Sequence, residues 1–204
     1  VVYNGVDLEA FHPRLRESFG ARARTELGIP PDAMTWLFVG SGFERKGVSR
    51  LVRAFRDGAD PGAHLIVVGS DRRELRARAE ARDLGARVHF LGGRDDVRPW
   101  YGAADAFVLP TLYDPFPNAA LEAMACALPV VTTLQCGAAE LVRADENGWV
   151  CDALDAVSLA RFMGALDRTR ARTMGERARA TAEGYGLDAM AQKLLALYRA
   201  LGPR

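Results

Sequence analysis

The sequence of 204 residues contains little lysine and little cysteine. Only Lys46 and Lys193 are lysines among its 27 basic residues, so a lysine in a loop of this chain draws attention. The three cysteines, Cys126, Cys136 and Cys151, lack the close spacing of metal ligands, and an odd number of thiols cannot all pair in disulfides. We therefore expect reduced, buried cysteines in a cytosolic protein and no disulfide framework.

The chain also lacks an excess of charge of one sign and any long hydrophobic run. Its formal net charge of +1 gives no general reason to expect binding to nucleic acid or to a membrane surface. No apolar run approaches the roughly 20 residues that cross a bilayer. The sequence starts at Val1 without a methionine or a targeting pattern, and we expect a cytoplasmic fragment of a longer protein.

Short apolar runs alternate with amphipathic stretches along the chain, which is the pattern of consecutive strand and helix units. Because the apolar runs are continuous rather than alternating, they favour a parallel sheet covered on both faces. Strands are predicted at residues 35–39, 63–68, 87–91, 106–109, 129–132 and 148–151. Helices are predicted at residues 17–27, 49–56, 72–84, 95–103, 118–126, 138–142, 156–166, 170–183 and 187–201.

These elements predict an α/β fold, with a Rossmann-like, doubly wound, mainly parallel six-stranded sheet, helices on both faces and extra C-terminal helices. We divide the chain into a lead-in segment at 1–34, the doubly wound domain at 35–186 and a C-terminal helix at 187–204. No internal repeat is evident.

The loop that follows the first strand has the composition of an anion site. Gly40, Ser41 and Gly42 let backbone amides approach a phosphate, and the following helix start favours negative charge. Arg45 and Lys46 add two cations to the same loop. The spacing fits neither a Walker A loop nor a dinucleotide fingerprint, in which Arg45 would have to be a glycine. A solvated turn with glycines at a helix start is the alternative.

The segment from Leu109 to Val131 places two carboxylates eight positions apart, Asp114 in a proline-rich loop and Glu122 on the following helix. Helix-start amides suit phosphate and carboxylates suit sugar hydroxyls, so a nucleotide-sugar would fit at this edge of the sheet. The two residues could also form a general acid/base pair, or serve only as a turn cap and an early helical acid. Asn118 is predicted to N-cap the helix.

A third candidate is the glycine turn after the third strand. Gly92 and Gly93 leave room for a flat base against the backbone beside Arg94, although a plain tight turn is an equal alternative. The adjacent Asp95 and Asp96 are a weak metal motif, because acidic pairs are common at helix starts. The histidines are scattered and are expected to pack rather than to ligate or catalyse: His12, His64 and His89.

Taken in order, four segments resemble the C-terminal half of GT-B-fold retaining glycosyltransferases of group 1 type, in particular the lipopolysaccharide-core sugar transferases. Glycogen synthase is a more distant likeness. The matching segments are 4–13, 39–48, 88–92 and 111–131, the last followed by 138–141 and 147–148. They cover nearly the whole chain up to about Cys151. Two positions depart from the family: Asp114 stands where Glu is usual, and Ala127 stands where Gly usually ends the helix.

The resemblance implies roles for individual residues. The catalytic group would comprise Arg45, Lys46 and Asp114. The two cations would hold the donor diphosphate and stabilise the negative charge on the leaving nucleoside diphosphate. Asp114 would face the donor sugar. Glu122 would bind the ribose hydroxyls. The full donor-binding set would be Gly40, Ser41, Gly42, Gly93, Arg94, Thr111, Phe116, Pro117, Asn118 and Glu122. No metal and no cofactor are expected, because Arg and Lys supply the positive charge.

The resemblance also implies a function for the parent enzyme. It would transfer a hexose from a nucleoside-diphosphate sugar, with UDP preferred, to a glycan acceptor such as lipopolysaccharide core, with retention of configuration. The acceptor would bind through an N-terminal domain that this chain lacks, so we expect little or no activity from the chain alone. Peripheral contact of the full-length enzyme with the inner membrane stays open. So do two other readings: a GT-B epimerase or phosphorylase relative, and a non-catalytic nucleotide-binding module.

Overall fold

The computed structural model describes residues 1–71 and 74–202 and has a six-stranded sheet at its centre. All strand pairs are parallel, and the order across the sheet is β3-β2-β1-β4-β5-β6. The strands are β1 (Thr35–Val39), β2 (His64–Val68), β3 (Val88–Gly92), β4 (Ala106–Leu109), β5 (Val130–Thr133) and β6 (Gly148–Cys151). The predicted α/β doubly wound fold is confirmed.

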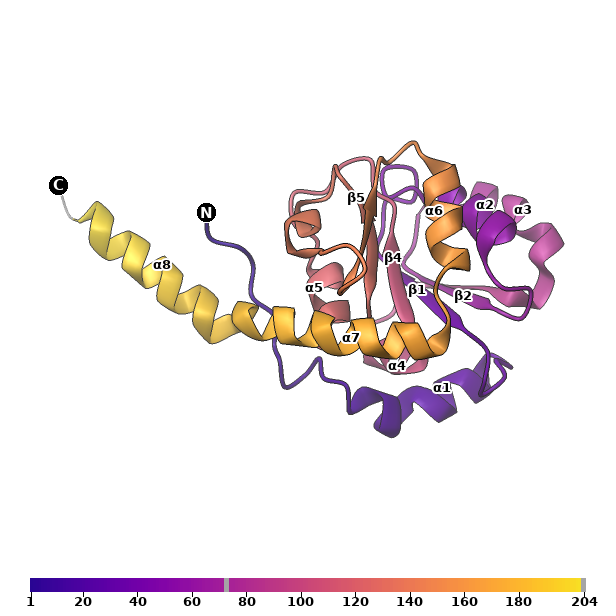
Figure 1. The fold of residues 1–204 in the computed structure, drawn as a ribbon, viewed down its shortest axis with the longest axis horizontal. Coiled ribbons are helices and arrows are strands. Elements are labelled where there is room, and N and C mark those ends of the chain that lie inside the picture. Colours follow the sequence, from indigo (N-terminus) through magenta and orange to yellow (C-terminus); the bar gives the residue numbers. More distant parts are fainter. Residues whose placement is uncertain (72–73, 203–204) are drawn as a thin grey trace.

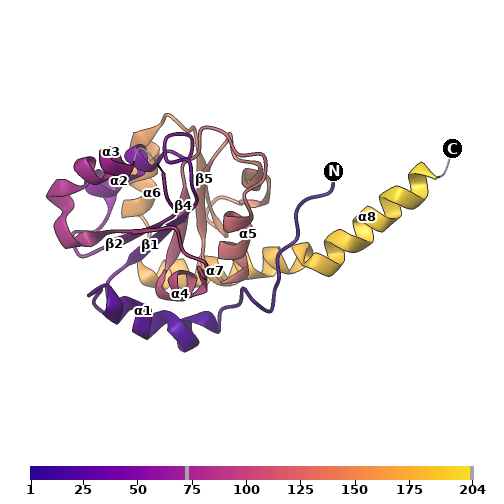
Figure 2. The same cartoon turned by 180° about the vertical axis from the view of Figure 1, so that it is seen from behind.

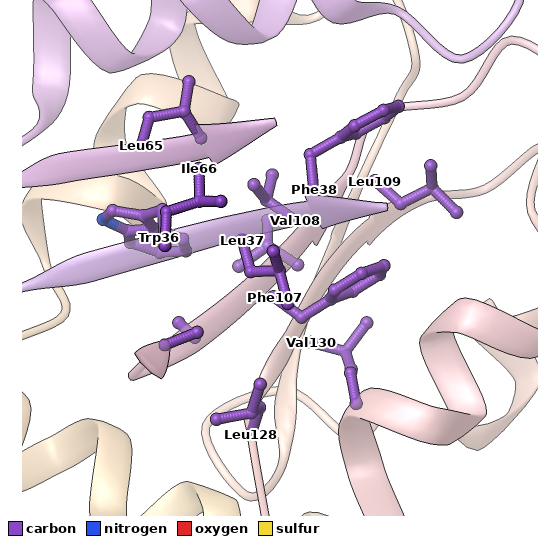
Figure 3. Close-up of a cluster of buried hydrophobic side chains, with 14 of the residues drawn as sticks. Trp36, Leu37, Phe38, Leu65, Ile66, Phe107, Val108, Leu109, Leu128 and Val130 are labelled. Atoms are coloured by element: carbon purple, nitrogen blue, oxygen red, sulfur yellow. The ribbon is translucent and has the colours of Figure 1, made fainter. Parts of the chain in front are cut away.

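The sheet forms because its central strands are apolar on both faces. Trp36, Leu37 and Phe38 of β1 have no exposed surface, and neither has Phe107 of β4. Figure 3 shows these side chains interleaved with those of β2 and β5 above and below the strands. Continuous apolar strands of this kind need cover on both faces, and the helices provide it.

Helices lie on both sides of the sheet (Figures 1 and 2). One side carries α2 (Val48–Gly58), α3 (Glu74–Glu80) and α6 (Ala156–Gly164), and the other carries α5 (Asn118–Ala125). The remaining helical elements are η1 (Arg16–Gly20), α1 (Ala21–Glu26), η2 (Arg82–Arg87), α4 (Arg98–Ala103), η3 (Gly137–Leu141), α7 (Arg168–Ala182), η4 (Glu183–Tyr185) and α8 (Leu187–Leu201).

Several helix boundaries differ from the prediction. Of the helix expected over 72–84, the first two positions lie outside the described residues; α3 is Glu74–Glu80, and a 3₁₀ segment over Arg82–Arg87 follows it, with Gly85 at φ +56°. The helix expected from residue 95 begins only at Arg98, because Asp96 binds the Arg98 amide and side chain ahead of it. The short helix predicted at 138–142 is a 3₁₀ turn.

The prediction that Asn118 caps α5 is wrong. Pro117 occupies the N-cap position with extended backbone, and no side chain caps the helix. Asn118 is instead the first helical residue, and its Oδ1 accepts a hydrogen bond of 2.9 Å from Nδ2 of Asn4. Its side chain therefore fastens the N-terminal segment to the start of α5.

Asp105, the residue before β4, collects arginines from three helical elements. Its Oδ1 accepts from Arg16 at 3.0 Å and from Arg168 at 3.3 Å, and its Oδ2 accepts from Arg24 at 2.7 Å. The Thr35 amide donates to Oδ2 as well, at 3.0 Å. One buried carboxylate thus joins the segment before β1 and the helix α7 to the start of the sheet.

The end of α5 holds a backbone strain that a single substitution should relieve. Ala127 has φ +58°, a left-handed conformation that costs a residue with a Cβ about 1 kcal/mol. We expect Ala127→Gly to raise the free energy of unfolding by about 0.5–1 kcal/mol, despite the added entropy of the unfolded chain. Denaturant unfolding measures it. Ala125→Gly, inside α5, should act in the opposite direction; a loss of stability in both variants would contradict the explanation.

His64 and His89 form a stacked pair at the sheet edge, with Nδ1 of one 3.0 Å from Nε2 of the other. Burial, with the neighbouring His64, lowers the pKa of His89 from 6.5 to about 4. The unfolded chain therefore takes up a proton that the folded ring resists, so stability is full above pH 6.5 and falls as the pH drops toward 4. We expect a loss of about 1–2 kcal/mol, since partial exposure screens the ring. His89→Phe should remove this component from unfolding curves at pH 4–7; an unchanged pH dependence would contradict it.

All three cysteines are free and buried, as predicted.

Helix α8 extends away from the body of the protein and has no buried residue (Figure 1). Within residues 1–71 and 74–202, no helix combines the length and the apolar character needed to cross a membrane.

Candidate functional site

The strand order reverses between β1 and β4, and this is the topological switch point at which doubly wound folds form a ligand crevice. From β1 the chain proceeds outward to β2 and β3, and from β4 it proceeds in the opposite direction to β5 and β6. The loops after β1 and β4 therefore leave the same edge of the sheet side by side and diverge, which is the position where doubly wound proteins bind ligands. These two loops carry the two sets of residues that the sequence singled out.

Two glycines allow the loops to approach each other. Gly47 has φ +77°, and a Cβ on it would lie 2.1 Å from the carbonyl oxygen of Pro110. Gly40 directly follows β1, and a Cβ there would lie 2.7 Å from Cδ of Lys46. Lys46 therefore lies across the backbone of its own loop, and this brings its ammonium group to the loop after β4.

Lys46, Arg45 and Asp114 form one charge cluster. Nζ of Lys46 lies 3.0 Å from Oδ2 of Asp114, and Nη1 of Arg45 lies 3.5 Å from the same oxygen. Lys46 and Asp114 are buried, with 9% and 8% of their surfaces exposed, whereas the Arg45 side chain is half exposed. Two cations share one carboxylate, so the cluster keeps one positive charge for an anion that arrives from solvent.

Backbone contacts hold the cluster in place. The carbonyl of Arg45 accepts hydrogen bonds from the Leu112 amide at 2.8 Å and from the buried Thr111 hydroxyl at 3.2 Å. The Asp114 amide donates to the carbonyl of Gln135, and the Asp114 carbonyl accepts from the Gly137 amide. Thr111, predicted as a donor contact, therefore connects the two loops through its hydroxyl. The loop after β5 therefore holds the backbone of Asp114, and the loop after β1 holds its carboxylate.

The start of α5 faces the N-terminal segment. Asn4 donates from Nδ2 to Asn118 and, at 3.4 Å, to the carbonyl of Phe116. The ring of Phe116 lies 5.1 Å from that of Tyr3. Pro117 is buried at the N-cap. The backbone between Asp114 and α5 is thus braced, and the helix start lies directly after the charge cluster in the chain.

Glu122 lies further along α5 and has a different neighbour. One of its oxygens, Oε2, accepts a hydrogen bond of 2.8 Å from the hydroxyl of Tyr101 on α4. Burial raises the pKa of Glu122, and the bond from Tyr101 partly offsets that rise. Sequence reasoning missed Tyr101, since one tyrosine in an apolar helix carries no signal of a polar partner. No hydrogen bond or ion pair among the described residues joins Glu122 to the charge cluster.

The other predicted residues are more dispersed. Ser41 is exposed, and the Gly42 carbonyl accepts from the Lys46 amide at 2.9 Å. Gly93 and Arg94 are exposed after β3, and Arg94 lines a cavity of about 250 Å³ that contains none of the cluster residues. Asp96 pairs with Arg98, and within the described part of the chain no group of three His, Cys, Asp or Glu side chains could hold a metal ion.

Comparison with known proteins identifies the family. A family model described as Glycosyl transferases group 1 matches residues 21–181. The chain belongs to the group 1 glycosyltransferases. The resemblance found in the motifs is therefore confirmed.

Individual relatives share a large part of this group 1 chain. D-inositol 3-phosphate glycosyltransferase 1 of Catenulispora acidiphila is 35% identical, over 97% of this chain and 50% of the relative. The lipopolysaccharide core biosynthesis glycosyltransferase LpsE of Rhizobium meliloti is 34% identical, over 79% of this chain and 48% of the relative. Anabaena Alr3699/HepE, solved in complex with UDP and glucose, superposes with a TM-score of 0.85 at 25% identity, over 97% of this chain and 56% of that chain. The chain spans about half the length of the curated relatives it matches.

Proposed function

We propose that this chain is the donor half of a retaining glycosyltransferase and binds a nucleoside-diphosphate sugar in the crevice between β1 and β4. The observation that carries the proposal is the charge cluster of Arg45, Lys46 and Asp114, which joins the loops after β1 and β4 and leaves one positive charge available. A diphosphate fits that charge and the helix start of α5 that follows.

The cluster gives each residue a task in the transfer. Arg45 is half exposed and can fork onto phosphate oxygens, while buried Lys46 offers a fixed point charge. As the bond between the sugar and the diphosphate breaks, negative charge grows on the departing phosphate, and both cations stabilise it. Asp114 fixes Lys46 beforehand and would face the donor sugar. Glu122 would accept hydrogen bonds from the ribose hydroxyls.

The nucleotide and the acceptor follow from the relatives by analogy. Alr3699/HepE was solved with UDP and glucose, which supports a UDP-sugar as donor. LpsE is named for lipopolysaccharide core and the Catenulispora acidiphila protein for inositol 3-phosphate. We favour transfer of a hexose to a glycan such as lipopolysaccharide core. The acceptor would bind to a part of the enzyme beyond this chain, so the chain alone would bind donor and turn over little or none of it.

No divalent metal enters the proposal, because Arg45 and Lys46 supply the positive charge that a metal provides elsewhere. Donor binding should accordingly be the same with EDTA as without it.

The test is a calorimetric titration of the chain with UDP-glucose, GDP-glucose and ADP-glucose, each with EDTA present. We expect UDP-glucose to bind with the highest affinity and Glu122→Ala to weaken it. Binding of a different nucleotide sugar would change the proposed base and leave the class intact. Absence of binding by all three, or affinity unchanged in Glu122→Ala, would overturn the proposed site.

A further inference from the structure

The buried hydroxyl of Tyr101 is an unexpected partner for a candidate ligand-binding acid. Tyr101 has 1% of its surface exposed, and its hydroxyl lies 2.8 Å from Oε2 of Glu122 and 3.1 Å from the carbonyl of Ala119. Both acceptors belong to α5, whereas Tyr101 belongs to α4. Burying a hydroxyl without a hydrogen-bond partner costs free energy, so these two bonds hold the Tyr101 hydroxyl against α5.

The ring of Tyr101 is fixed by its neighbours as well. The ring of Phe11 in the N-terminal segment meets it edge-on with centroids 5.5 Å apart, and the ring of Phe107 on β4 is stacked with centroids 6.4 Å apart. The hydroxyl therefore has little freedom to follow Glu122 if that side chain moves. The Tyr101 hydroxyl therefore sets the position of the Glu122 carboxylate.

Glu122 is only partly buried, and one of its two oxygens is held. A carboxylate held by one oxygen keeps the other free to accept hydrogen bonds from a ligand, in a direction that is set in advance. The bond from Tyr101 also favours the ionised form, and the ionised form accepts without competing as a donor.

We propose that Tyr101 is a positioning residue for donor binding: its hydroxyl holds Glu122 so that the free oxygen receives the ribose diol of the nucleotide. This inference rests on the proposed function, because it requires Glu122 to contact the ribose. Tyr101 itself touches no ligand, and its contribution passes entirely through Glu122.

The test compares UDP with 2′,3′-dideoxy-UDP, two ligands that differ only in the ribose hydroxyls. Calorimetric titration of the parent chain should show a preference for UDP on the order of tenfold or more. Tyr101→Phe keeps the ring and its packing but removes the hydroxyl, and it should reduce this preference several-fold while leaving the affinity for dideoxy-UDP nearly unchanged. Tyr198→Phe on α8, where the tyrosine is 67% exposed, is the matched control and should change neither affinity.

A pH series supplies a readout that a loss of packing would not produce. The titratable groups that act on Glu122 or are acted on by it are Tyr101 of α4 and Cys126, the residue after α5. Arg179 of α7 lies near the Cys126 thiol and donates to the carbonyl of Ala125. The preference for UDP should decline as the pH falls and Glu122 takes up a proton. Its midpoint should move to higher pH in Tyr101→Phe, because the bond that favours the ionised form is gone. Dideoxy-UDP carries the same phosphates, so the ratio of the two affinities cancels their titration.

The outcomes separate this inference from the proposed function. If the parent does not prefer UDP, or if Glu122→Gln retains the full preference, the assignment of Glu122 to the ribose fails and the proposed function fails with it. If Glu122→Gln abolishes the preference while Tyr101→Phe keeps both the preference and its pH midpoint, only the role of Tyr101 is overturned. Should Tyr101→Phe prove unstable, Glu122→Asp, which withdraws the carboxylate from Tyr101 by one methylene, should reproduce the reduced preference; a preference equal to the parent's would overturn the inference.

Discussion

Replacing Lys46 with alanine should weaken binding of UDP-glucose to this chain roughly 10- to 100-fold, the range of one lost charge-assisted hydrogen bond. The substitution removes one of two cations that share Asp114, so the net charge of the cluster falls from +1 to zero. A diphosphate would then meet a neutral site and only the half-exposed Arg45. Calorimetric titration at fixed salt measures the change, since ionic strength alters such contacts.

The chain provides its own control for Lys46. Lys193 is the only other lysine, and it lies over the ring of Tyr185 at 5.3 Å, at the base of α8. Lys193→Ala should leave the affinity for UDP-glucose unchanged. An affinity of Lys46→Ala within threefold of the parent, in a protein that unfolds at the parent temperature, would contradict the role of the cluster.

Replacing Asp105 with asparagine should have the largest effect on stability, a loss of about 3–5 kcal/mol. Asn keeps the size of Asp but not its charge, and it leaves Arg24, of which 6% is exposed, without a counter-charge in a buried position. Arg16 and Arg168 lose the same partner, which releases both the segment before β1 and helix α7. The unfolding temperature should fall by roughly 6–20 °C.

Asp96→Asn is the matched control for Asp105. Asp96 also pairs with an arginine, Arg98, but both side chains are 45% exposed. Exposed pairs contribute little, so this variant should stay within about 1 kcal/mol of the parent. Equal losses in Asp96→Asn and Asp105→Asn, or a loss below 1 kcal/mol in the latter, would show that Asp105 does not join these elements as described.

Strands could be predicted from the sequence because a strand that is buried on both faces is a continuous run of apolar residues. The runs at 35–39, 106–109 and 148–151 are continuous and apolar, and their limits match β1, β4 and β6. Helix ends were less predictable, because they depend on contacts made across the fold. Asn118 has the right chemistry for an N-cap, yet it bonds to Asn4, a residue 114 positions away.

The candidate site could likewise be predicted only in part from the sequence. Its residue types are visible in the sequence, since glycines, paired cations and acids occur after strands. The pairing of Lys46 with Asp114 is not, because 68 residues separate them and only the adjacency of β1 and β4 brings their loops together. Tyr101 gave no signal at all, because its role depends on which face of α4 meets α5.

The segment boundaries at residues 34 and 186 stay a prediction, as does the role of each donor contact. Arg94 illustrates why: it follows β3, which is separated from β4 by two strands, and contacts between separate loops depend on the ligand that joins them. The charge cluster, by contrast, is formed by contacts between side chains of the protein and needs no ligand.

A crystal structure of this chain with UDP-glucose would show where the donor binds. We expect the diphosphate within hydrogen-bonding distance of Nζ of Lys46 and the guanidinium of Arg45, with the ribose hydroxyls on Glu122. A nucleotide bound elsewhere on the chain, or a diphosphate beyond the reach of both cations, would contradict the proposed site.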